Sequence, residues 1–165
     1  MIRRALVPLL ALAAAVSQGA WTRFIDPVGH FGLEMPTQPN RRTDAVTLQH
    51  QHVMIYIHDS KGAVGRVLAM AAKLPAAISG DNSKGVPEEF IETEFHRMHA
   101  KEISRTFDKA GGHDGYDIDF TIGKARGRAF VTVVGNHLIG IFMTNPTKSG
   151  LSTLSNHVLK SFSAR

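Results

Sequence analysis

Residues 126–144 read RGRAFVTVVGNHLIGIFMT, and this stretch decides the fold. Two apolar runs flank Gly135-Asn136, a dipeptide typical of the two-residue turns that close β-hairpins. With that turn, Val133 lies opposite Leu138 in the two paired strands. Large apolar side chains occur on both faces of both strands. We therefore expect this hairpin to lie inside an antiparallel sheet that is covered on both faces.

Further strands are predicted where apolar and polar residues alternate or where apolar residues dominate a short run. Such segments are residues 31–35, 67–74 and 116–122, and each is followed by Pro or Gly. Residues 45–58 also read as one extended segment. Its alternation slips near residues 51–53, which predicts a β-bulge at that point.

Two helices are predicted, and residues 87–106 contain the clearer one. Pro87 suits a first helical turn, acidic residues follow it, and Lys101 and Arg105 lie near the negative end of the helix dipole. An apolar stripe over residues 151–162 predicts a second helix. The order of strands, helix, strands and helix predicts an α+β fold in which helices cover an antiparallel sheet.

Residues 1–20 have the features of a cleavable secretory signal peptide. Arg3 and Arg4 supply a positive charge, residues 5–16 form an uncharged apolar run, and small or polar residues follow. That run is too short to span a bilayer comfortably, and no second long apolar run occurs. We expect one domain, residues 21–165, in the periplasm or outside the cell, with no integral membrane segment after cleavage. An uncleaved leader that tethers the same domain is the alternative.

The composition narrows the classes of function. The chain has 165 residues and a formal charge of +5, which falls to 17 basic against 14 acidic residues, or +3, without Arg3 and Arg4. It has no Cys, which excludes thiol catalysis and thiolate metal sites. A dense basic cluster of the kind that binds nucleic acid is absent from the sequence, and export also argues against a nucleic-acid partner.

Nine histidines suggest a metal site, and His50 and His52 are the first candidates. Residues two apart on a regular strand point the same way, so this pair could chelate Zn or Cu. The spacing fixes no third ligand. The alternative is a polar strand face near the edge of a sheet.

Glu92, His96 and His99 form a second candidate metal set. Their spacings of four and three place them on one flank of the predicted helix. Two imidazoles and one carboxylate could hold a divalent metal with open coordination positions. The alternative is a solvated helix flank on which Glu92 and His96 interact weakly.

Three basic residues, Lys124, Arg126 and Arg128, follow a strand that carries Asp117 and Asp119 on one face. Cross-strand ion pairs are the first interpretation of this pattern. An anion-binding or head-group site is the second.

The sequence resembles PsbP-like domains over nearly all of residues 21–165. The resemblance rests on residues 24–36, FIDPVGHFGLEMP, on the hairpin region 123–138, and on the close VLKSF at residues 158–162. This superfamily includes the extrinsic photosystem II protein PsbP, a eukaryotic Ran-binding import factor and many exported bacterial proteins. Residues 53–72 depart from its pattern.

The resemblance implies an antiparallel sheet between helices, an α/β/α sandwich, and no shared catalytic residues. Our leading hypothesis is therefore a non-catalytic, exported binding or accessory domain without a resident cofactor. It would bind an envelope protein, a lipid or a small ligand through loops and a groove between sheet and helix. A metal-binding protein or metal-dependent enzyme and an envelope- or lipid-associated structural protein are the alternatives.

Overall fold

The computed structural model describes residues 21–165. The predicted signal peptide, residues 1–20, lies outside the described residues and stays a prediction. Within residues 21–165, no helix is long and apolar enough to cross a membrane.

A seven-stranded antiparallel sheet forms the centre of the molecule, with the strand order β3-β4-β5-β9-β8-β7-β6. Its strands are β3 (Asn40–Leu48), β4 (Gln51–Gly62), β5 (Gly65–Lys73), β6 (Lys101–Ala110), β7 (His113–Ile122), β8 (Ala125–Val134) and β9 (His137–Asn145). Short turns join strands that follow one another in the sequence, except after β5. There the chain crosses one face of the sheet before it continues as the edge strand β6.

The hairpin predicted over residues 126–144 is confirmed. β8 and β9 pair around Gly135 and Asn136, with Val133 opposite Leu138, and Gly135 has a positive φ of 61°. Alternate side chains of these two strands enter two separate apolar clusters, so both faces of the sheet are covered as predicted.

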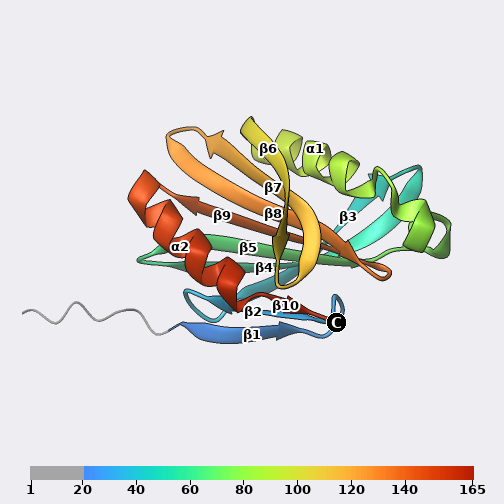
Figure 1. Ribbon diagram of the computed structural model, residues 1–165, viewed down its shortest axis with the longest axis horizontal. Coiled ribbons are helices and arrows are strands. Elements are labelled where there is room, and N and C mark those ends of the chain that lie inside the picture. Colours follow the sequence, from blue (N-terminus) through green and yellow to red (C-terminus); the bar gives the residue numbers. More distant parts are fainter. Residues whose placement is uncertain (1–20) are drawn as a thin grey trace, which may run out of the picture.

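The two faces are covered by different layers (Figure 1). Helix α1 (Val86–Met98), preceded by the short 3-10 helices η1 (Ala76–Ile78) and η2 (Gly80–Ser83), packs on one face. Helix α2 (Lys148–Ser161) shares the other face with a three-stranded sheet of β1 (Thr22–Asp26), β2 (Phe31–Met35) and β10 (Ser163–Ala164). The predicted α+β architecture is thus correct in part, because one covering layer is half helix and half sheet.

The segment 45–58 is a hairpin, so the prediction of one extended strand with a bulge is wrong. β3 and β4 are joined at Gln49 and His50, which have φ values of 47° and 63°. Residues other than Gly seldom adopt such angles. Gln49 makes two hydrogen bonds to residues at or just before the start of α1. Its backbone N–H donates to Glu89 Oε2 at 2.8 Å, and its side-chain amide donates to the Lys84 carbonyl at 2.7 Å.

The first helix ends at Met98, eight residues before the predicted end. His99 has a left-handed backbone (φ 52°), and its N–H donates to the His96 carbonyl at 3.2 Å. The N–H of Ala100 donates to the Phe95 carbonyl at 2.9 Å, which completes the helix cap. Lys101 therefore begins strand β6, and the basic residues expected at the end of the helix lie on that strand.

Candidate binding groove

A groove of about 310 Å³ runs between the start of α1 and the nearby ends of β6, β7 and β8. Pro87 occupies the first turn of α1, where its missing N–H leaves no unmet hydrogen bond. The side chains that decide the character of the groove are those of Lys84, Pro87, Glu88, Phe107, Tyr116 and Val133.

Two aromatic rings form one wall of this groove. Phe107 on β6 lies opposite Tyr116 on β7, with the ring centroids 5.4 Å apart in an edge-to-face arrangement. The Tyr116 hydroxyl donates to the Glu88 carboxylate at the start of α1. That hydrogen bond, together with partial burial and the Glu88 charge, raises the pKa of Tyr116 above its usual value. The phenol therefore stays a protonated donor, and the wall is tied to the helix.

Strand β6 borders the groove and is an edge of the seven-stranded sheet. Its outer backbone groups therefore face no strand among the described residues. Phe107 is 67% exposed and Ile103 is 60% exposed, although both are large apolar side chains. A register shift between Glu102 and Ser104 leaves Ile103 outside the ladder. A bulge of this kind disrupts the first part of the edge strand and hinders pairing with another chain there. Residues 104–110 keep a regular pairing with β7.

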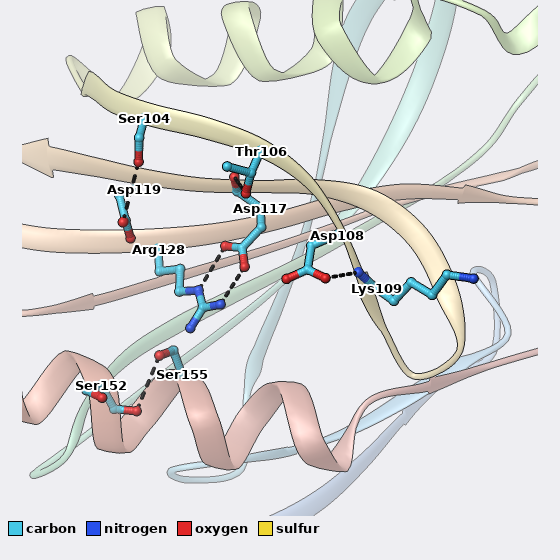
Figure 2. A network of polar contacts seen from close by, with 9 residues as sticks. All are labelled: Ser104, Thr106, Asp108, Lys109, Asp117, Asp119, Arg128, Ser152 and Ser155. Atoms are coloured by element: carbon cyan, nitrogen blue, oxygen red, sulfur yellow. Dashed lines mark hydrogen bonds and ion pairs between the residues drawn. The ribbon is translucent and has the colours of Figure 1, made fainter.

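The opposite face of β6 and β7 carries a polar network above α2 (Figure 2). Arg128 on β8 makes two bonds to the Asp117 carboxylate, of which the Nε–Oδ1 bond is 2.8 Å long. These bonds raise the pKa of Arg128, and Asp119 and Asp108 add to the effect. A cleft of about 270 Å³ lies here, with Lys160 of α2 on its other side.

The three basic residues singled out in the sequence have different surroundings. Arg128 is bonded to Asp117, which confirms the cross-strand ion pair for this residue. Arg126 lies opposite Thr121 at the start of β8, and Lys124 lies in the turn before it. The anion-binding interpretation of Lys124, Arg126 and Arg128 stays a prediction, with Arg128 already engaged by a carboxylate.

His50 and His52 do not form the pair that the sequence suggested. His50 is in the β3–β4 turn, whereas His52 is on β4, where its Nδ1 lies 3.4 Å from the Thr47 hydroxyl. The prediction of a shared strand face is wrong because it assumed a strand that runs through the turn.

The residues of the second candidate metal set, Glu92, His96 and His99, do not share one helix flank. Glu92 and His96 are on α1 and exposed, whereas His99 lies beyond the last helical residue with a left-handed backbone. Over residues 21–165, no group of three His, Asp or Glu side chains converges in a way that could hold a metal ion. The metal hypothesis therefore has no assembled ligand set to support it.

A buried polar pair, Asp26 and His58, was not among the residues predicted from the sequence. The carboxylate of Asp26 is 0% exposed and His58 is 3% exposed, and Asp26 Oδ1 lies 2.8 Å from His58 Nε2. The other carboxylate oxygen accepts the Gly29 N–H. Burial opposes ionisation, but the bonds from His58 and Gly29 outweigh it and lower the pKa of Asp26. The turn at residues 26–29 was predictable, but no local signal marks His58 as its partner.

Comparison with solved structures places the chain in the PsbP-like fold. The solution structure of cyanobacterial PsbP (CyanoP) from Synechocystis sp. PCC 6803 matches with a TM-score of 0.61 and 13% identity, over 94% of this chain and 99% of that one. A crystal structure from Bacteroides thetaiotaomicron VPI-5482 matches with a TM-score of 0.51 and 18% identity, over 87% of this chain and 48% of that one. No family model and no curated protein matches the sequence. At these identities the likeness concerns the fold alone.

Proposed function

We propose that this chain is an exported, non-catalytic accessory domain that binds a protein partner through the groove beside β6. The observation that carries the proposal is Phe107, a large aromatic side chain that is 67% exposed on an edge strand at the wall of the groove. A sheet edge is a template for pairing with another chain, and an exposed apolar side chain on it favours such pairing.

The contacts around Phe107 suit an extended segment of the partner. Such a segment can pair with the regular part of β6, residues 104–110, and place every second side chain against the groove. Phe107 and Tyr116 provide an apolar surface there, while Lys84 and Glu88 provide charges of both signs at the rim. An apolar side chain flanked by polar residues would fit these surroundings.

Two considerations support a binding role over catalysis. Tyr116 and Glu88, two of the ionisable groups at the groove, are engaged with each other in a hydrogen bond. The PsbP-like fold also brings with it no catalytic set that these residues match. Export rests on the leader in residues 1–20, and a periplasmic or secreted location follows from it.

A photo-crosslinking amino acid at position 107, introduced in the native host, tests the proposal. We expect a discrete crosslinked product whose partner is identified by mass spectrometry. Amide hydrogen exchange on the purified complex should then show slower exchange along residues 104–110, because strand pairing protects the outer N–H groups.

Met54 provides the matched control position, since it is also an exposed large apolar residue but lies on β4. The same reagent at position 54 should not capture the partner. The proposal is wrong if positions 54 and 107 give the same products, or if the captured partner leaves exchange along β6 unchanged.

A further inference from the structure

A second hollow, of about 320 Å³, lies on the small three-stranded sheet, in the layer on the opposite side of the large sheet from α1. The basic side chains that line it are Arg23, His30 and Arg165, and Ile25, Pro27 and Ser163 also line it. Ile25 is 70% exposed, so the hollow has an apolar rim beside a basic wall.

The guanidinium of Arg23 is held in place by neutral groups. Its Nη1 donates to the Ser161 carbonyl at 2.6 Å and its Nη2 donates to the Ser163 hydroxyl at 3.0 Å. Among the ion pairs of residues 21–165, none involves Arg23. The arginine is thus fixed in position, while its charge is left without a carboxylate partner and several N–H groups remain free to donate.

Gly32, which lies beneath the Arg23 guanidinium, leaves room for it because it has no side chain. A Cβ atom on Gly32 would lie 2.9 Å from Arg23 Nη2 and 3.4 Å from its Cζ. Gly32 pairs with Ile25 on one side and with Ser163 on the other, so the guanidinium lies across the middle strand of the small sheet. The glycine therefore permits the position in which Arg23 reaches both serine residues.

Asp26, the acidic residue that lines the hollow, does not neutralise the positive charge of its arginines. Asp26 is fully buried, and its two oxygens are engaged by His58 and the Gly29 N–H. His30, in contrast, is exposed in the turn after Gly29, and the backbone N–H of Arg165 donates to its carbonyl at 3.1 Å. The groups that face a ligand in this hollow are therefore predominantly basic.

We propose that this hollow binds the phosphate group of an organic phosphate, with the organic part resting on Ile25 and Pro27. A phosphate offers several oxygens in a tetrahedral arrangement, which suits donors that approach from Arg23, His30 and Arg165. A guanidinium also forms paired hydrogen bonds to phosphate oxygens. This inference goes beyond the proposed function, because it concerns a different layer of the molecule and a different class of ligand.

Isothermal titration of the domain, residues 21–165, with glycerol 3-phosphate tests the proposal for a soluble ligand. Co-sedimentation with phosphatidylglycerol vesicles, against phosphatidylcholine vesicles, tests it for a lipid head group. Arg23→Gln should weaken binding in whichever assay is positive by about tenfold or more, because a charge-assisted hydrogen bond is lost. Gly32→Ala should weaken it as well, since the new methyl group displaces the guanidinium.

Arg42→Gln is the matched control, because Arg42 is an exposed arginine on β3 and its removal changes the net charge equally. Binding that is specific to the hollow falls in Arg23→Gln and Gly32→Ala but not in Arg42→Gln. An equal loss in Arg23→Gln and Arg42→Gln would show general attraction to anions and overturn the proposal. Absence of binding in both assays overturns it too, provided that thermal unfolding shows the wild-type domain to be folded.

Discussion

The carboxylate of Asp26 and the imidazole of His58 connect the two sheets of this protein. Asp26 ends β1 of the small sheet and His58 lies on β4 of the large one, and their side chains meet at 2.8 Å with almost no exposure to solvent. The Phe24 ring covers the imidazole, with the ring centroids 4.3 Å apart. A buried polar contact thus helps to fix the position of a layer that also packs through apolar side chains.

Replacing Asp26 by Ala should lower the free energy of unfolding by about 3 kcal/mol, because it leaves a buried imidazole and the Gly29 N–H without their acceptor. Urea denaturation at neutral pH measures the change. Asp59→Ala is the control: Asp59 pairs with Arg66 near the surface, and its loss should cost about 1 kcal/mol or less. Equal costs for the two substitutions would contradict the structural role of the buried pair.

Acid should remove the contribution of Asp26. The folded protein holds the pKa of Asp26 below its usual value of 3.8, so the unfolded chain binds a proton at higher pH than the folded one. The stabilisation is therefore complete above that value and declines as the pH falls through it toward the lower folded pKa. The difference in unfolding free energy between wild type and Asp26→Asn should shrink below about pH 4. A difference that is constant from pH 7 to pH 3 would rule this out.

Phe107→Ser should abolish partner binding while leaving stability nearly unchanged, within about 0.5 kcal/mol, because the side chain is mostly exposed. The measurements are affinity for the captured partner and the midpoint of thermal unfolding. Met54→Ser should change neither quantity appreciably. If Phe107→Ser unfolds the domain, the ring has a packing role that its exposure does not reveal.

A side chain at Gly127 on β8 would collide with a neighbouring aromatic ring. A Cβ atom there would lie 2.3 Å from the ring of Phe120, which crosses over the glycine from β7. We expect Gly127→Ala to lower the unfolding free energy by about 1–3 kcal/mol through overpacking. The same substitution should cost less in a Phe120→Leu background, because the smaller side chain relieves the contact. Strict additivity of the two changes would disprove this explanation.

The predictions from the sequence are correct where local chemistry decides the conformation of the backbone. Gly135-Asn136 favours a two-residue turn in any context, and the resulting β8–β9 register was predicted residue by residue. The turn at Gln49 and His50 has the same length but lacks such residues. It is supported by Lys84 and Glu89, which lie more than thirty residues further along the chain, so a local pattern could not reveal it.

The sequence predicted the type of candidate site, but not the residues that form it. A groove between sheet and helix followed from the expected layers, but its aromatic wall depends on β6, of which residues 101–106 were assigned to a helix. The sequence has no Gly or Pro near His99 to mark the end of α1, and the histidine itself adopts the left-handed conformation. The fixed position of Arg23 likewise depends on Ser161 and Ser163, at the other end of the sequence.

The position of β10 has a consequence for how the chain matures. β2 pairs with β1 through a short local turn, but its second neighbour is β10, and Ser163 lies opposite Gly32. Phe162, beside this strand, packs against Phe31 and Phe130. A polypeptide that emerges from a ribosome or a translocon with its amino end first must expose one edge of β2 until residues 162–164 arrive. The small sheet therefore cannot be complete before residues 163–164 are available, because one of its three strands lies at the far end of the chain from the other two.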